Sequence, residues 1–186
     1  MSVQIARRHF NIIEYYRMTE AGILSQGDRV ELIDGEVIEM SPINSRHAAC
    51  VDRLNKLLNR LVEQDVIVRV QDPIILDDYS EPQPDLSLLR PRHDFYAEGH
   101  PTPADVLLVV EVADSSTQVE REIKLPLYAQ AMLPEVWLIS LPDDTIERYS
   151  QPADGAYQLA QTLKRGEVLI STIILNLNLD VAAILG

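Results

Sequence analysis

Residues 106–140 read VLLVVEVADSSTQVEREIKLPLYAQAMLPEVWLIS. The segment opens with the apolar run Val106–Val112 and closes with a second run, Val136–Ser140, and both patterns predict buried strands. Between them, residues 118–131 have the pattern of a helix. A helix of this length between two strands is typical of a crossover connection, which joins parallel neighbours in a sheet. The segment therefore predicts a strand–helix–strand unit.

The sequence before this unit predicts a hairpin and a long helix. Asp34-Gly35 separates two runs that alternate with period two, 29–33 and 36–40, and Asp-Gly there indicates a type I′ turn. Residues 45–64 carry the apolar stripe of an amphipathic helix, and 15–25 indicate a shorter one. Further strands are expected at 66–70, 74–76, 86–89, 145–149, 157–162 and 173–179.

These elements predict one fold class for the chain. We expect a mixed, strongly twisted sheet with the long helix on one face and the second helix on the other. The class is α/β, or α+β if the sheet is mostly antiparallel. The length of 186 residues suits a single domain over 1–186. No repeat or low-complexity linker marks a second domain.

Composition indicates the cellular setting. No apolar run approaches the roughly 18 to 20 residues that span a bilayer, so we expect no membrane partner. The first eleven residues lack the apolar core of a secretory signal. The single Cys50 excludes an intrachain disulfide, which fits a reducing, cytoplasmic setting.

The net charge of −13 weighs against tight, autonomous binding to DNA, because phosphate backbones are bound through Lys and Arg. It does not exclude catalysis on DNA. A metal-dependent site is itself acidic, and bound cations offset part of its charge.

Three charged residues are placed where they can share a site. Asp85 precedes the apolar run 86–89, Glu111 ends the next run, and Lys124 lies on the following helix. Carboxylate oxygens select hard cations such as Mg²⁺ or Mn²⁺. The alternative is that Asp85 caps a turn, Glu111 forms an ordinary ion pair and Lys124 is solvated.

Several motifs in order carry a family resemblance. They are Glu-Leu-Ile-Asp-Gly-Glu (31–36), Ser-Pro-Ile (41–43), His47, Pro-Gln-Pro-Asp (82–85), Glu-Val-Ala-Asp-Ser-Ser (111–116), Lys124, Tyr128 and Pro-Glu-Val-Trp-Leu (134–138). From about Tyr15 to Asp180 the chain resembles the Uma-two family of restriction endonucleases, within the PD-(D/E)XK nuclease superfamily. The resemblance implies a restriction-endonuclease-like fold.

The resemblance also implies roles for particular residues. Asp85 and Glu111 match the two metal-binding acids. Position 113, where the superfamily usually has Lys, is Ala, and Lys124 on the next helix matches the lysine that supplies the charge instead. Glu31 resembles an additional acid contributed by an early element of the fold.

Other positions are weaker candidates. His47, Arg90 and Arg92 are candidate contacts for substrate phosphate, although a lone His near a helix start is more often packed and hydrogen-bonded. Met132 stands where the family commonly has Gly, which suits the positive φ at a helix end. We therefore expect this helix end to be strained or differently shaped.

The sequence thus leads to a functional hypothesis: a metal-dependent endonuclease that hydrolyses DNA with Mg²⁺ or Mn²⁺. A homodimer is expected, because cutting two strands is simplest with two sites related by a two-fold axis. Two alternatives stay open. One is an inactive nuclease-fold module that binds a protein or nucleic-acid partner, and the other is a hydrolase of small phosphate esters.

Overall fold

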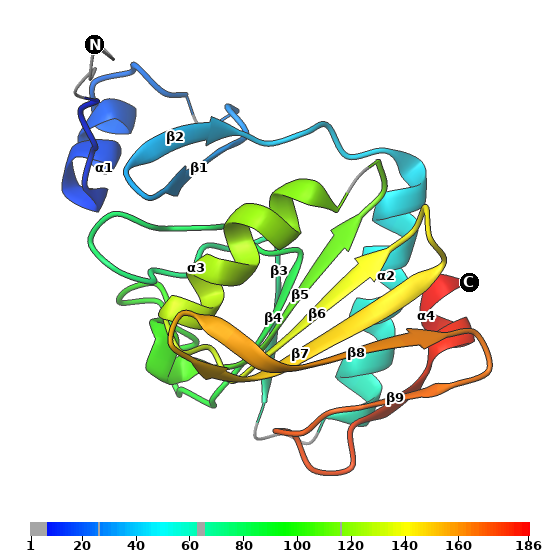
Figure 1. Ribbon diagram of the computed structural model, residues 1–186. Helices are drawn as coiled ribbons and strands as arrows, with labels where there is room; N and C mark the ends of the chain where they lie inside the picture. The colour runs from blue at the N-terminus through cyan, green and yellow to red at the C-terminus, as the bar shows by residue number, and fades with distance from the viewer. Residues whose placement is uncertain (1–6, 26, 63–65, 116) are drawn as a thin grey trace, which may run out of the picture.

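The computed structural model of the chain describes residues 7–25, 27–62, 66–115 and 117–186. A six-stranded sheet, in the order β3-β4-β5-β6-β7-β8, lies at the centre of the fold. Its strands are β3 (Ile67–Val70), β4 (Leu86–Leu89), β5 (Val106–Ala113), β6 (Glu135–Ser140), β7 (Thr145–Ala153) and β8 (Ala156–Lys164). Figure 1 shows that this sheet is twisted and has helices on both faces.

The predicted strand–helix–strand unit is confirmed. β5 and β6 are parallel neighbours, with Glu111 opposite Leu138. The connection between them contains η2 (Glu120–Lys124) and α3 (Leu125–Gln130). The other four strand pairings of the sheet are antiparallel. The sheet is mixed and mostly antiparallel, which is the α+β form of the predicted class.

The two main helices cover opposite faces of the sheet, as predicted (Figure 1). On one face, α2 (Ser45–Leu61) contributes Leu54 to a core that includes Val110 of β5. On the other face, Tyr128 of α3 belongs to a second core. Successive strand residues point to opposite sides of a sheet. Glu111 therefore points to the side covered by α3, away from Val110.

The hairpin predicted around Asp34-Gly35 is confirmed as β1 (Val30–Ile33) and β2 (Glu36–Glu39). Asp34 has φ 49° and Gly35 has φ 75°, as a type I′ turn requires. A Cβ atom at Gly35 would lie 2.5 Å from His9 Cβ, so this turn accepts only glycine there.

The first helix begins and ends earlier than predicted. The pattern indicates residues 15–25, whereas α1 is Ile12–Glu20. Asn11 is its N-cap: the Asn11 side chain accepts from the Glu14 backbone N–H, and the Glu14 side chain accepts from the Asn11 backbone N–H. This capping box fixes the start of the helix.

The long helix starts where predicted, at Ser45, and α2 ends at Leu61; the expected last residue, Gln64, lies outside the described residues. One further short 3₁₀ helix, η1, is Pro103–Asp105. Within the described ranges, no helix combines the length and apolarity needed to cross a membrane.

The strand predicted at 74–76 is not formed. Ile74 and Leu76 are buried, but the Ile74 N–H donates to the Pro82 carbonyl within a loop rather than to a sheet. The apolar run serves burial here, and burial alone does not require a strand.

The C-terminal region also differs from the prediction of a strand at 173–179. Only β10 (Asn178–Asp180) is a strand, and it pairs with the unpredicted β9 (Val168–Ile170). Asn176 has φ 61°, so the chain turns before β10. The final helix, α4 (Val181–Leu185), follows directly.

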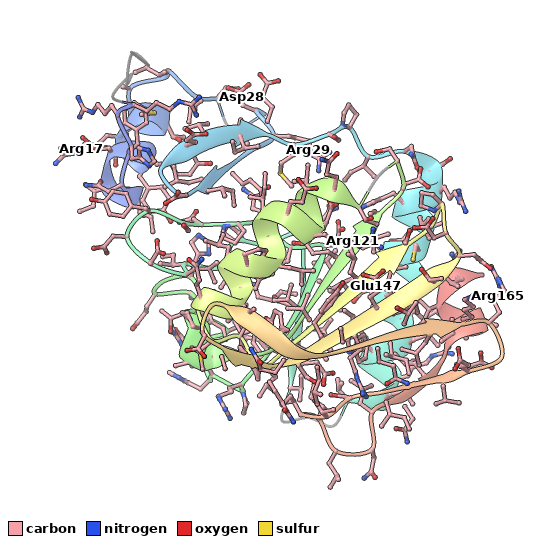
Figure 2. The ribbon with its side chains drawn as sticks, viewed as in Figure 1. Arg17, Asp28, Arg29, Arg121, Glu147 and Arg165 are labelled. Carbon is pink, nitrogen blue, oxygen red and sulfur yellow. The ribbon has the colours of Figure 1, made fainter. Side chains whose placement is uncertain are left out.

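The helix between β5 and β6 contains an unusual turn. In η2 the Leu125 N–H donates to the Glu120 carbonyl, five residues earlier, so the turn is π-helical. Pro126 follows; it has no N–H and needs space at the carbonyl four residues before it, which accounts for the widened turn. Arg121 Nε donates to Glu147 of β7 at 3.2 Å and ties this turn to the sheet (Figure 2).

Candidate active site

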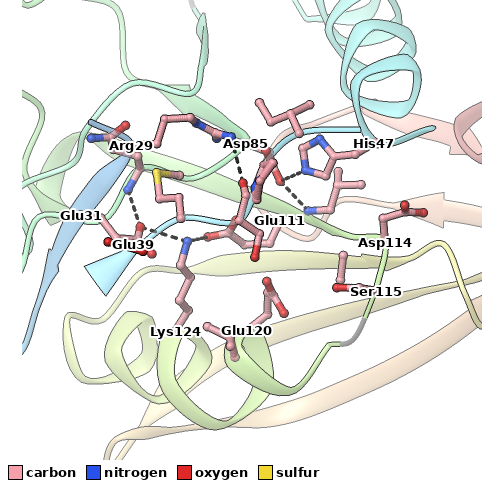
Figure 3. A pocket seen from close by; sticks show the side chains of 18 of the residues that line it. Arg29, Glu31, Glu39, His47, Asp85, Glu111, Asp114, Ser115, Glu120 and Lys124 are labelled. Carbon is pink, nitrogen blue, oxygen red and sulfur yellow. Dashed lines mark hydrogen bonds and ion pairs between the residues drawn. The ribbon is translucent and has the colours of Figure 1, made fainter. Parts of the chain in front are cut away.

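A cleft of about 320 Å³ lies between several segments of the fold (Figure 3). They are the β1–β2 hairpin, the start of α2, the residues just before β4, the end of β5 and the η2 turn. Its acidic lining residues are Glu31, Glu39, Asp85, Glu111, Asp114 and Glu120. The basic side chains in the lining are Arg29, Lys124 and His47. Carboxylates outnumber cationic groups, so the cleft favours a bound cation.

Asp85 is held at the start of β4 by donors from three directions. Its Oδ2 accepts from the Val112 backbone N–H at 2.9 Å and lies 3.1 Å from His47 Nε2. Its Oδ1 accepts from Gln71 Nε2 at 3.1 Å. Val112 directly follows Glu111 on β5. The hydrogen bond from the Val112 N–H therefore fixes the Asp85 carboxylate next to the Glu111 position.

Glu111 lies near the end of β5 and is 4% exposed. Its Oε1 accepts from the Tyr128 hydroxyl at 2.6 Å and lies 3.3 Å from Lys124 Nζ. Burial raises the pKa of Glu111 to about 7, although Lys124 opposes this rise. Burial thus disfavours the charged form of Glu111, and the neighbouring Lys124 ammonium favours it.

Lys124 reaches this cleft from the η2 turn and is 6% exposed. Its Nζ lies 3.1 Å from Glu31 Oε2 and 3.3 Å from Glu111 Oε1. Burial alone would lower the pKa of Lys124, but the two carboxylates outweigh it and raise the pKa above its usual value. Lys124 is therefore an ammonium ion, held between two acids.

Glu31 joins the hairpin to this site. Its Oε2 also accepts from the backbone N–H of Gln83 at 3.1 Å. The Gln83 side chain donates to the Val30 carbonyl at 3.2 Å, so the loop before β4 and strand β1 hold each other. Gln83, which flanks Asp85 in the sequence, thus positions Glu31.

His47 lies in the first turn of α2, whose N-cap Asn44 accepts from the His47 backbone N–H. The hydrogen bond to Asp85 raises the pKa of His47, although burial opposes this rise. His47 Nδ1 is buried and has no hydrogen-bond partner among the described residues. His47 therefore contacts the site through Asp85.

The structure does not bring Arg90 and Arg92 to the cleft. They follow β4 at the end opposite Asp85, and the five residues from Asp85 to Arg90 span about 16 Å in an extended strand. Arg90 Nε donates to the Ala104 carbonyl, and Arg92 pairs with Asp94. Neither residue lines the cleft, and their contact with substrate phosphate stays a prediction.

Some lining and supporting residues were not predicted from the sequence. Tyr128 is one of the residues that carry the family resemblance. It lies four residues after Lys124, so helical spacing could have placed it beside the site. Glu120 lies four residues before Lys124, so the same helical spacing could have placed it beside the site. Gln71 comes from the loop after β3, and no sequence pattern links it to Asp85.

The donor set of the cleft fits a hard divalent cation. Asp85 and Glu111 offer carboxylate oxygens to one cleft, as Mg²⁺ and Mn²⁺ prefer. Within the part of the chain that the structure describes, no group of three or more His, Cys, Asp or Glu side chains forms a ready metal cluster. Mg²⁺ commonly uses one or two carboxylates and keeps several waters, so a two-acid site is sufficient.

Comparison with known proteins identifies the family. The sequence profile described as “Uma2: Putative restriction endonuclease” matches residues 13–182. The chain belongs to this family. The Uma2 match spans the hairpin, the cleft and the whole central sheet, and no curated protein matches the chain.

A solved structure shares the Uma2 chain's fold. A protein from Anabaena variabilis, described as a putative nuclease belonging to DUF820, superposes with a TM-score of 0.73 at 15% sequence identity. The match covers 95% of this chain and 97% of that chain. At this identity the similarity establishes the shared fold alone.

Proposed function

We propose that this cleft hydrolyses phosphodiester bonds of DNA with Mg²⁺ or Mn²⁺ as cofactor. The observation that carries the proposal is the convergence of Asp85, Glu111, Lys124 and Glu31 on one cleft of a Uma2 family member. These residues come from segments far apart in the sequence.

Asp85 and Glu111 would hold the metal ion. When bound, such an ion supplies Lewis-acid stabilisation of phosphate charge and lowers the pKa of a water molecule. The donors around Asp85 hold its carboxylate in a fixed orientation. His47 acts as a positioning residue, since it contacts Asp85 directly.

Lys124 has an electrostatic role in this proposal. Its two ion pairs keep it protonated, so it offers a fixed positive charge rather than a base. A preorganised charge in a buried site stabilises the negative charge that develops on a phosphate in the transition state. Glu31 positions this ammonium, and Tyr128 holds Glu111 beside it.

DNA is the proposed substrate because the family is described as restriction endonucleases. A homodimer remains a proposal, since two sites related by a two-fold axis suit cleavage of two strands. Light scattering of the purified protein tests it. The proposed cytoplasmic setting fits Cys50, a buried free thiol.

Plasmid cleavage tests the proposed activity. Supercoiled DNA is incubated with the protein and Mg²⁺ or Mn²⁺, or with EDTA. We expect nicking or linearisation that EDTA abolishes, and a loss of at least about 100-fold in Asp85→Ala, Glu111→Ala and Lys124→Ala.

The matched control for this assay is Asp144→Asn, because Asp144 is an exposed carboxylate on the turn before β7 that pairs with Arg165. This variant is expected to cleave like wild type. Equal cleavage by all the cleft variants and wild type would exclude the assigned site.

The acidity of the cleft favours a second candidate, a hydrolase of smaller phosphate esters, because a small substrate avoids the repulsion between a long polyanion and an acidic chain. Turnover of a small aryl phosphodiester and of duplex DNA under the same conditions separates the two. Faster turnover of the small ester, with no cleavage of DNA, would favour the second candidate.

A further inference from the structure

Among the cleft carboxylates near Lys124, Glu120 differs from the others in its contacts. Glu120 lies in the η2 turn, four residues before Lys124, and lines the same cleft (Figure 3). Its Oε2 is buried and has no hydrogen-bond partner among the described residues. An oxygen in this state keeps its lone pairs available.

The other three carboxylates near Lys124 are engaged by donors. Asp85 accepts from backbone and side-chain donors on both oxygens. Glu111 accepts from Tyr128 and pairs with Lys124, and Glu31 accepts from the Gln83 N–H and pairs with Lys124. These contacts occupy oxygens of all three carboxylates and leave fewer of their lone pairs free to take a proton from a water molecule.

The two nitrogen bases in the cleft are poor proton acceptors. Lys124 is held as an ammonium ion by two acids, so it has no lone pair. His47 Nε2 is engaged with Asp85 Oδ2 at 3.1 Å, so this ring nitrogen is not free to take a proton from a water molecule. Hydrolysis nevertheless requires that a proton leave the attacking water.

We propose that Glu120 is the general base of this site and takes the proton from the attacking water. This inference rests on the proposed hydrolysis of phosphodiesters. The water oxygen forms a bond to phosphorus while its proton moves to Glu120 Oε2. The bond from phosphorus to the leaving sugar oxygen breaks, that oxygen takes a proton from solvent, and Glu120 later returns its proton to solvent.

The surroundings of Glu120 agree with this role. Burial raises the pKa of Glu120. A hydrogen bond from its own backbone N–H and the charge of Lys124 lower this pKa, and Asp85 and Glu31 add to the rise. A base is most effective when its pKa approaches the working pH. The π-helical turn also fits, since single π turns inside helices are frequent at functional sites.

The test compares Glu120→Gln with Glu122→Gln. Glu122 lies in the same η2 turn but is exposed and contacts Gln118, so it is a matched control. In plasmid cleavage with Mn²⁺ we expect Glu120→Gln to lose about 10²- to 10⁴-fold in rate and Glu122→Gln to cleave like wild type.

Two further measurements separate a base from a metal ligand or a structural residue. Calorimetric titration with Mn²⁺ is expected to give the same affinity for Glu120→Gln and wild type within about threefold. In Glu120→Ala, added formate is expected to restore part of the lost rate, because it supplies a carboxylate in the vacated space. The melting temperature of Glu120→Gln is expected to equal or exceed that of wild type, because the variant removes a partly buried charge with one oxygen that has no hydrogen-bond partner among the described residues.

Wild-type cleavage rates in Glu120→Gln would overturn the assignment. So would loss of Mn²⁺ binding in this variant, which would make Glu120 a cation ligand. If wild type cleaves neither DNA nor a small phosphodiester, the proposed function itself fails and this inference fails with it.

Discussion

Lys124 supplies the positive charge that pairs with the buried carboxylates of the cleft. Its ammonium neutralises part of two carboxylates, Glu31 and Glu111, that are each 4% exposed. Removing one member of a buried ion pair leaves the remaining charges without compensation. Stability and proposed activity therefore meet in the same residue.

We predict that Lys124→Met destabilises the protein by about 3–5 kcal/mol, because both carboxylates lose their buried partner. The double variant Lys124→Met/Glu111→Gln is expected to recover part of this loss, since it removes one of the uncompensated charges. Denaturant unfolding of wild type, both single variants and the double variant measures this coupling. Additive effects would show that Lys124 and Glu111 do not interact.

Glu111 predicts a pH dependence of stability. Its pKa is about 7 in the folded protein and close to the ordinary value of 4.5 when unfolded. The folded state therefore holds a proton more tightly, so the contribution to stability is complete below about pH 4.5 and is lost as pH rises through about 7. The expected loss is about 3 kcal/mol between pH 4.5 and 8 in metal-free protein.

The matched measurement is denaturant unfolding of wild type and Glu111→Gln across this pH range. Glutamine does not titrate, so the stability difference between the two proteins isolates Glu111. We expect the variant to gain on wild type as pH rises. Parallel pH curves would contradict the raised pKa.

At the end of α3, the residue in the sequence does not suit the backbone conformation of its position. Met132 has φ 59°, and the Leu133 N–H donates to the Tyr128 carbonyl, which is the pattern of a Schellman motif with Met132 at C′. This position suits glycine, which is the residue that the resembled family commonly has there. A side chain with positive φ costs about 1 kcal/mol or more.

Met132→Gly is therefore expected to stabilise the protein by about 1 kcal/mol, because it relieves the strained φ. Met132 is 59% exposed, so little packing is lost with the side chain. Met132→Ala is the control, since alanine keeps the strain and should bring no gain. A lower melting temperature for Met132→Gly than for Met132→Ala would refute this account.

Elements with a strong local signal could be predicted from the sequence. The hairpin follows from Asp34-Gly35, and the parallel pair follows from a helix between two apolar runs. The π-helical turn could not be predicted, because it depends on how Pro126 meets the packed helix. Residues 74–76 show the same limit: their burial comes from loop contacts distant in sequence.

At the scale of the molecule, the order of the acids and the lysine predicted a shared cleft, and the structure brings Asp85, Glu111, Lys124 and Glu31 together. The sequence could not show that Arg90 and Arg92 lie at the opposite end of β4 from the cleft. It also could not reveal Gln71 or the free oxygen of Glu120, because such contacts arise only when separate segments pack.

The acidic chain predicts that DNA binding depends on divalent cations. With a net charge of −13, the protein repels a phosphate backbone unless bound cations offset the charge of the cleft. In fluorescence anisotropy with a labelled duplex, we expect at least about tenfold tighter binding in Ca²⁺ than in EDTA. Asp85→Asn should lose this gain, and equal binding in both buffers would contradict it.

The central claim is that Asp85 and Glu111 jointly hold a divalent metal beside the Lys124 ammonium. Anomalous diffraction from a crystal soaked in Mn²⁺ tests this claim most directly. The account predicts a strong anomalous peak between the Asp85 and Glu111 carboxylates. An empty cleft, with Mn²⁺ bound only at other carboxylates of the surface, would contradict it.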